Sequence, residues 1–177
     1  MLSGIRAITH CNTMRAIILS AGRGSRMGKI TDSVPKSLLP IGELTILTRL
    51  ILQLLERGVT KITVVVGYKK DIVKNTIEGF KHDFFKRRLK SDIKDEIQII
   101  ENPMYKEDIN ILSLATGLGP KNKDPFFVFE SDCIYDDKCI DKIIETGFHE
   151  DSYWYSMGPF ESKQLGGLLL TDSMGNV

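Results

Sequence analysis

Short apolar runs alternate along this chain with segments of helical periodicity, and this alternation constrains the fold more than any other feature. We predict strands over Arg15–Ser20, Lys61–Val66, Ile97–Ile100 and Pro125–Phe129. We predict helices over Ile46–Glu56, Asp71–Phe80, Asn110–Leu118 and Asp137–Thr146. Because helices separate the apolar strands, the pattern predicts βαβ units, a mostly parallel sheet and right-handed crossovers.

The two ends of the chain differ from this pattern. Residues 1–13 lack the apolar stretch of a signal peptide, and we interpret them as an extension that precedes one domain over residues 14–177. Tyr153–Met157 and Leu168–Thr171 are typical of later strands. Thr171–Asn176 then has the composition of a hairpin turn, and the chain stops at Val177. We therefore expect a domain that lacks its C-terminal part.

Charge and cysteine content exclude several classes of protein. The chain has 24 basic and 23 acidic residues, a formal net charge of +1, which argues against nucleic acid or a membrane surface as a partner. No apolar run approaches the roughly 20 residues that span a bilayer. The three cysteines have no CxxC spacing, so we expect a reducing, cytoplasmic location and no structural zinc.

The segment from Gly22 to Lys29 follows the first predicted strand and is rich in glycine and basic residues. It is not a P-loop, because five residues separate Gly22 from Gly28 and no Ser or Thr follows Lys29. It is not a dinucleotide fingerprint, because Met27 takes the place of the third glycine. Glycines let backbone N–H groups approach phosphate oxygens, and nearby cations suit a triphosphate. The alternative is an ordinary turn whose basic residues serve solubility.

Two chemically distinctive segments both follow predicted strands: 21–37, which we predict to be a loop, and 130–132. Ligands of open parallel sheets bind beyond the carboxyl ends of the strands. We therefore expect these segments to meet in one crevice.

The motif Leu19-Ser-Ala-Gly-Arg-Gly-Ser-Arg-Met27, followed by Pro35-Lys-Ser-Leu-Leu-Pro40, closely resembles the signature of nucleotidyltransferases that activate sugar phosphates and related phosphate esters. Val64-Val-Val-Gly-Tyr68 also resembles the layout of that family, so the resemblance covers about residues 14–177. It implies a Rossmann-like, three-layer αβα sandwich. It also implies transfer of NMP from an NTP to a phosphate ester, with release of pyrophosphate.

The resemblance implies a role for each matching residue. Arg26 and Lys36 would be the catalytic residues, with Arg26 on the triphosphate and Lys36 near the reacting phosphates. Asp132 would hold Mg²⁺, and Ser131 stands before it where the family usually has a small residue. A second metal ligand, found further along in the family, has no counterpart before Val177. The expected nucleotide-binding residues are Leu19, Ala21, Gly22, Gly24, Ser25, Arg26, Lys36, Gly67 and Asn110.

Glu101-Asn-Pro-Met-Tyr105 and the segment 108–114 resemble an element of the choline-phosphate cytidylyltransferase-like branch, near the base and the acceptor. Asn110 is the residue we assign there, with a helix N-cap as the alternative or additional role. Tyr153-Trp-Tyr155 offers aromatic rings for a quaternary ammonium such as choline, with plain sheet packing as the alternative.

The sequence thus predicts a Mg²⁺-dependent enzyme, with CTP the favoured NTP and a small phosphate ester such as phosphocholine the acceptor. A sugar-1-phosphate nucleotidylyltransferase or a molybdenum-cofactor-type transferase is the second interpretation. A catalytically silent nucleotide-binding or regulatory domain is the third. The oligomeric state stays open, with a homodimer as one option.

Overall fold

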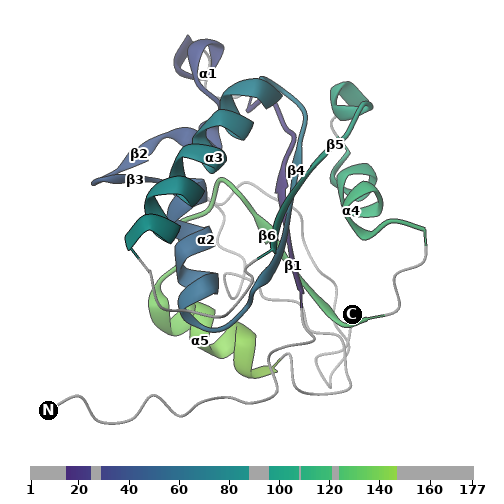
Figure 1. Cartoon of the computed structure of the whole chain (residues 1–177). Coiled ribbons are helices and arrows are strands. Elements are labelled where there is room, and N and C mark those ends of the chain that lie inside the picture. Colours follow the sequence, from purple (N-terminus) through teal and green to yellow (C-terminus); the bar gives the residue numbers. More distant parts are fainter. Residues whose placement is uncertain (1–14, 25–28, 88–95, 108, 121–123, 147–177) are drawn as a thin grey trace, which may run out of the picture.

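A parallel sheet forms the centre of the molecule (Figure 1). The computed structural model describes residues 15–24, 29–87, 96–107, 109–120 and 124–146. Its main sheet has four strands in the order β5-β4-β1-β6, and all three pairings are parallel. These strands are β1 (Arg15–Ser20), β4 (Lys61–Val66), β5 (Glu96–Glu101) and β6 (Phe126–Glu130). The predicted α/β class and parallel sheet are confirmed.

Helices cover both faces of this sheet. In Figure 1, α2 (Ile46–Glu56), α3 (Lys70–Arg87) and α5 (Asp137–Thr146) lie on one side, and α4 (Asn110–Leu118) lies on the other. The bounds of α2, α4 and α5 are those predicted from the sequence. Helix α3 begins one residue before the predicted start at Asp71 and continues past the predicted end at Phe80, because the next residues, Lys81, His82 and Asp83, are polar and give no apolar periodic signal.

The larger apolar core lies between the sheet and α2, α3 and α5. Leu47, Leu50, Ile51 and Leu54 of α2 are almost fully buried in it. Helix α2 begins where Thr45 and Thr48 form a reciprocal capping box, and it is followed by Gly58 at a φ of 82°. Helical periodicity and these end signals explain why its bounds are predictable.

A smaller core lies on the other face, beneath α4. It contains buried Ile17, Leu19 and Val65, with Leu114 and Leu118 packed against them. Gly117 lets the helix approach closely, since a Cβ there would lie 2.8 Å from methyl carbons of both Ile17 and Val65.

Several short elements were not predicted from the sequence. The segment 21–37, predicted as a loop, contains α1 (Lys29–Ser33) and the 3₁₀ turn η3 (Lys36–Leu38). A small antiparallel pair, β2 (Pro40–Ile41) and β3 (Leu44–Thr45), precedes α2, and a 3₁₀ turn, η4 (Tyr105–Glu107), follows β5. Single turns of helix are too short to carry a periodic signal.

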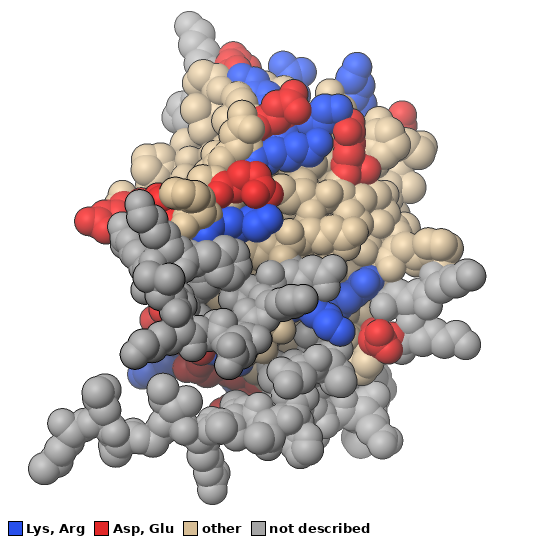
Figure 2. All heavy atoms as spheres, viewed as in Figure 1, with Lys and Arg blue, Asp and Glu red and all other residues tan. Residues whose placement is uncertain are grey.

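The surface of the described residues has mixed charge. On the face seen in Figure 2, basic and acidic side chains are interspersed, in keeping with the near-zero net charge. None of the described helices combines the length and the apolar character that crossing a bilayer requires. The proposed extension at 1–13 and the strands predicted at 153–157 and 168–171 lie outside the described residues.

Candidate functional site

The carboxyl ends of β1 and β6 lie side by side at one edge of the sheet. The strand order reverses direction here, because β4 lies on one side of β1 and β6 lies on the other. The backbone N–H of Ser131 donates to the carbonyl oxygen of Leu19 at 3.2 Å, which joins the segments that follow the two strands. Leu19 therefore contributes to this edge through its backbone, while its side chain is buried in the smaller core. Such a reversal point is where open α/β sheets form ligand crevices.

Lys36 and Asp132 come into direct contact at this edge. Lys36 Nζ lies 2.8 Å from Asp132 Oδ2, and the two side chains are 36% and 40% exposed. Lys36 is carried on η3, where buried Ser37 accepts a hydrogen bond from Ser20 Oγ at 3.0 Å. The turn that presents Lys36 is thus tied to the end of β1, and both side chains remain accessible to a ligand.

The glycine-rich segment begins directly beyond β1. Ala21 is buried, Gly22 is exposed and Gly24 has a φ of 65°, a conformation that glycine adopts without strain. Thr31 Oγ1 donates to the carbonyl oxygen of Gly24 at 3.1 Å, which connects the segment to α1. The predicted residues Ser25 and Arg26 lie outside the described residues.

Gly67 allows neighbouring residues to pack closely because it has no side chain. A Cβ at Gly67 would lie 2.4 Å from the Cβ of Tyr105 and 2.9 Å from the carbonyl oxygen of Ala21. Only glycine permits this approach, so the turn after β4 packs directly against the start of the glycine-rich segment.

Tyr68, which we did not assign to the site from the sequence, contacts the residues that flank the glycine-rich segment on both sides. Its backbone N–H donates to Ala21 O at 3.0 Å, and its hydroxyl donates to Thr31 O at 3.3 Å. The Arg23 guanidinium carbon lies 5.8 Å from the centre of the Tyr68 ring, within the range of a cation–π contact. Tyr68 thereby holds the segment from the neighbouring strand.

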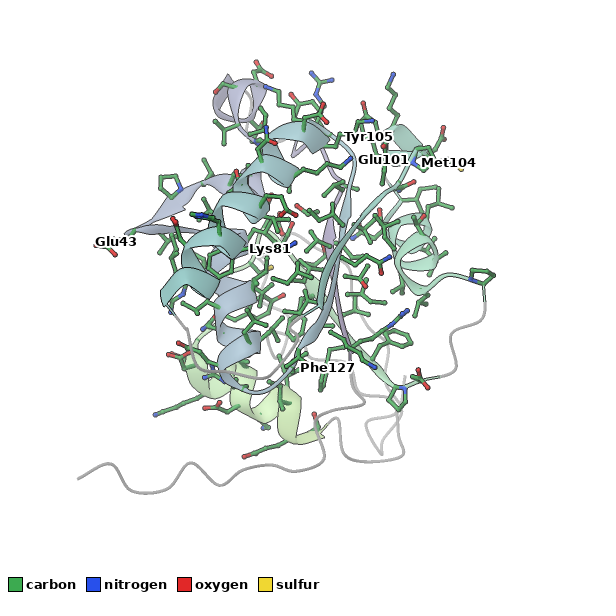
Figure 3. All side chains as sticks on the ribbon, viewed as in Figure 1. Glu43, Lys81, Glu101, Met104, Tyr105 and Phe127 are labelled. Carbon is green, nitrogen blue, oxygen red and sulfur yellow. The ribbon has the colours of Figure 1, made fainter. Side chains whose placement is uncertain are left out.

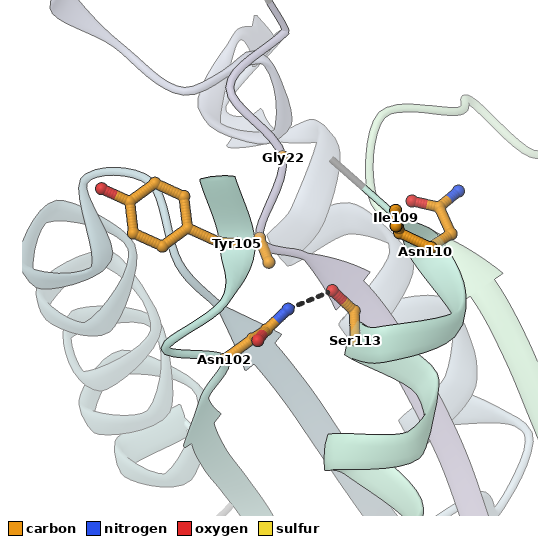
Figure 4. A pocket seen from close by; sticks show the side chains of 7 residues that line it. Gly22, Asn102, Tyr105, Ile109, Asn110 and Ser113 are labelled. Carbon is orange, nitrogen blue, oxygen red and sulfur yellow. Dashed lines mark hydrogen bonds between the residues drawn. The ribbon is translucent and has the colours of Figure 1, made fainter. Parts of the chain in front are cut away.

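A shallow hollow opens beside Ala21 and Gly22 (Figure 4). Its other lining residues come from the segment after β5 and from the start of α4: Asn102, Tyr105, Ile109, Asn110 and Ser113. Figure 3 shows Glu101, Met104 and Tyr105 at the same end of the sheet, far from Phe127 near the start of β6. The hollow therefore lies at the carboxyl edge, beside the predicted nucleotide loop.

Asn102 is the buried polar centre of this hollow, and sequence reasoning did not single it out. Its Nδ2 donates to Ser113 Oγ at 3.0 Å, and its Oδ1 accepts from the Met104 N–H at 2.9 Å. Its position directly after an apolar strand is the signal that could have identified it. Both hydrogen bonds fix the amide, so the polar lining is rigid.

Asn110 lines the hollow, but it does not cap α4 as the alternative interpretation expected. Ile109 occupies the N-cap position and makes no side-chain capping bond. Asn110 Nδ2 instead donates to Glu130 Oε1 at 2.8 Å, across to the end of β6. Its side chain therefore joins the start of α4 to the end of β6 and does not cap its own helix.

Burial changes the acid–base properties of the groups at the end of β6. Burial, and then the charge of nearby Asp132, raise the pKa of Glu130 above the usual glutamate value. The same two causes raise the pKa of the Cys133 thiol. The thiol is therefore neutral at pH 7 and poorly suited to act as a nucleophile.

The donor atoms here are oxygens of the kind that Mg²⁺ prefers. Asp132, the predicted Mg²⁺ ligand, is partly exposed. Within the described ranges, no group of three or more His, Cys, Asp or Glu side chains could hold a metal ion. Mg²⁺ commonly binds one or two carboxylates and completes its shell with water and substrate phosphates. The residues present therefore fit a Mg²⁺ ion that arrives with a nucleotide.

The fold and this edge define an α/β domain with a ligand site at the carboxyl ends of a parallel sheet. The chain belongs to the family described as the MobA-like NTP transferase domain, whose family model matches residues 16–157. The family predicted from the two-part motif is thereby confirmed.

Individual relatives differ in what their names say they do. Bifunctional protein GlmU of Methanococcus maripaludis is 37% identical over 136 residues, covering 74% of this chain and 27% of that protein. The 2-aminoethylphosphonate cytidylyltransferase of Lancefieldella rimae is 29% identical over 132 residues, covering 75% of this chain and 48% of that protein. The chain thus spans between about a quarter and a half of the length of these relatives.

A solved structure has the same fold. A nucleotidyl transferase from Methanothermobacter thermautotroptrophicus matches with a TM-score of 0.58 and 22% identity, over 78% of this chain and 58% of that chain.

Proposed function

We propose that this chain, as one domain over residues 14–177, binds an NTP and transfers its NMP to a small phosphate ester, with release of pyrophosphate. The contact between Lys36 Nζ and Asp132 Oδ2 at 2.8 Å, beside the glycine-rich segment, is the observation that carries this proposal. The same ion pair elsewhere on the surface would indicate only ordinary surface charge. Here both side chains sit at a reversal point of the sheet, which favours a reactive phosphate site.

In the proposed reaction, an oxygen of the acceptor phosphate attacks the α-phosphorus of the NTP. The new P–O bond forms as the bond to the bridging oxygen breaks, and pyrophosphate leaves with that electron pair. Lys36 stabilises negative charge on the reacting phosphates, and Arg26 does the same on the departing pyrophosphate. Positioning and charge stabilisation are the whole task of the protein, because no covalent intermediate is needed.

Asp132 is the residue that would hold Mg²⁺. When bound, the ion supplies positive charge that neutralises the phosphate oxygens. Lys36 and Asp132 neutralise each other while the site holds no nucleotide. Arrival of the triphosphate gives Lys36 a partner of higher charge and leaves the Asp132 carboxylate to act as a ligand.

CTP is the NTP that we favour, and the acceptor is a small phosphate ester such as phosphocholine or a phosphonate that carries an amino group. The similarity to a 2-aminoethylphosphonate cytidylyltransferase supports this choice, as does a hollow lined by the amides of Asn102 and Asn110. A sugar 1-phosphate acceptor is the second candidate. The higher identity to Bifunctional protein GlmU, and 28% identity over 123 residues to a mannose-1-phosphate guanyltransferase of Emericella nidulans, support it.

The test is a pyrophosphate-release assay with Mg²⁺. It crosses CTP, UTP, GTP, ATP and dTTP with phosphocholine, 2-aminoethylphosphonate, glucose 1-phosphate and mannose 1-phosphate. We expect release with CTP and one of the first two acceptors. Release only with a sugar 1-phosphate would select the second candidate. NTP binding without release across the whole panel would favour the silent nucleotide-binding domain instead.

Two substitutions test the site itself. Lys36→Ala and Asp132→Ala should each lower kcat/KM by at least about 100-fold, because each removes charge at the reacting phosphates. Lys138→Ala on α5 and Asp83→Ala on α3 remove the same charges from exposed positions away from the crevice. Both controls should retain wild-type turnover. Wild-type rates in folded Lys36→Ala or Asp132→Ala protein would contradict the assignment.

A further inference from the structure

Glu130 joins two sides of the crevice, and the proposed reaction gives its link to α4 no role. It is the last residue of β6, and its Oε1 accepts a hydrogen bond from Asn110 Nδ2 at 2.8 Å. Asn110 is the first residue of α4 and lines the hollow beside Gly22. The bond spans residues that are 20 positions apart in the sequence, so it is a tertiary link and not a helix cap.

The chemistry of the two groups fixes which way the Asn110 amide faces. A carboxyl oxygen accepts and an amide NH₂ donates, and Asn110 Nδ2 donates to Glu130 Oε1, so the NH₂ of Asn110 is turned toward Glu130. The carbonyl oxygen of the amide then faces the other way. Figure 4 shows the nitrogen of Asn110 turned away from the hollow and its oxygen on the side of the hollow. Among the described residues, no hydrogen bond reaches this oxygen.

Tyr135 holds the backbone of Glu130 in place. The backbone N–H of Glu130 donates to the Tyr135 hydroxyl at 3.2 Å, and that hydroxyl lies 3.3 Å from the carbonyl oxygen of Glu130. The Tyr135 ring packs edge-on against buried Phe129, with 5.5 Å between ring centroids. A fixed acceptor can impose one orientation on a more exposed amide.

We infer that Glu130 is a positioning residue that fixes the Asn110 amide with its carbonyl oxygen toward the hollow, so that the site selects a nucleotide offering a hydrogen-bond donor at that point. This inference rests on the proposed function, because it requires a nucleotide in the hollow. The donors of cytidine are the exocyclic amino group of the base and the hydroxyls of the ribose. Either would pair with the Asn110 oxygen, and an acceptor such as a keto oxygen would not.

The experiment measures nucleotide binding by titration calorimetry, so that it does not depend on turnover. The full chain is titrated with CTP, UTP and 2′-deoxy-CTP as wild type, Glu130→Leu, Glu130→Gln, Asn110→Ala and the Glu130→Leu/Asn110→Ala double variant. Glu145→Leu, on exposed α5, is the matched control for loss of a glutamate. Circular dichroism confirms that each variant is folded.

We expect Glu130→Leu to weaken CTP binding about tenfold, because the amide can then turn its NH₂ to the hollow. Glu130→Gln can still accept from Asn110 and should bind CTP within about threefold of wild type. The double variant should bind no more weakly than Asn110→Ala, because Glu130 acts through Asn110. Loss of CTP-over-UTP preference in Glu130→Leu identifies the base amino group as the donor, and loss of CTP-over-deoxy-CTP preference identifies the ribose.

Other outcomes overturn the inference. If Glu130→Leu keeps wild-type affinity and preference, or weakens binding equally in the Asn110→Ala background, Glu130 does not position Asn110, while the proposed function stands. If folded wild-type protein binds no nucleotide, the proposed function fails and the inference fails with it.

Discussion

The two faces of the sheet are built differently. The face beneath α2, α3 and α5 carries the larger core, in which side chains such as Leu54 and Ile77 are fully buried. Among the residues that the structure describes, the face beneath α4 has a core of three buried residues, and Ile111 of the helix is 63% exposed. The hollow and its polar lining lie on this second face.

Polar links differ between the faces in the same way. On the first face, Gln53 of α2 and Arg57 at the C-cap of that helix bind Asp137 and Asp141 of α5, which joins the two helices. On the second face, Asn102 binds Ser113 and Asn110 binds Glu130, and both pairs adjoin the hollow. Within the described part of the chain, one face thus contributes more of the buried apolar core, and the other places more polar groups beside the hollow.

The largest expected difference concerns core truncation. Leu54→Ala on α2 should lower the free energy of unfolding by about 2–5 kcal/mol, because it removes a fully buried side chain and leaves a cavity. Ile111→Ala on α4 should change it by less than about 0.5 kcal/mol. Urea denaturation of both variants measures the contrast, and equal losses would show that the two faces contribute alike.

Glycine substitutions sharpen the comparison at the helix backbones. Gly117→Ala on α4 should cost about 1–3 kcal/mol, because its Cβ would lie 2.8 Å from Ile17 and Val65. Gly79→Ala on α3 meets nothing within 4 Å and should stabilise the protein by about 0.5–1 kcal/mol. Thermal unfolding distinguishes the two signs. A stabilised Gly117→Ala protein would mean that α4 is not held closely on the sheet.

The smallest effect tests the polar link between α2 and α5, and it depends on pH. Hydrogen bonds from Gln53 and then Arg57 lower the pKa of Asp137 in the folded protein. A lowered carboxyl pKa gives stability that is present above the unfolded value of about 3.9 and is lost as pH falls through the folded value. Asp137→Ala should therefore lower the midpoint of thermal unfolding by a few degrees at pH 7 and by much less at pH 3.

Asp71→Ala is the matched control, because Asp71 is also an exposed acid in the first turn of a helix. It loses the interaction with the helix dipole but no partner equivalent to Gln53. The same pH dependence in both variants would assign the effect to the dipole and not to the link.

Local sequence was sufficient for the long elements, and it indicated that two of the proposed site residues would lie close together. Helix α2 has both helical periodicity and end signals, and its predicted bounds match the structure. Lys36 and Asp132 were assigned from a motif and from a strand end, and they lie in contact. Tyr68 and Glu130 belong to segments that the sequence analysis named, but neither was assigned a role, because nothing in their neighbouring sequence shows what they contact. The N-cap interpretation of Asn110 failed for the same reason.

The sequence by itself determined the alternation of strands and helices, the parallel sheet and the family, because apolar periodicity and a two-part motif are local properties of the chain. Only the tertiary structure decided which groups face the hollow. Contacts such as Asn110 with Glu130 and Tyr68 with Thr31 join residues 20 and 37 positions apart. Their geometry depends on how α4, β6 and the turn after β4 pack around β1, and no local pattern encodes that packing.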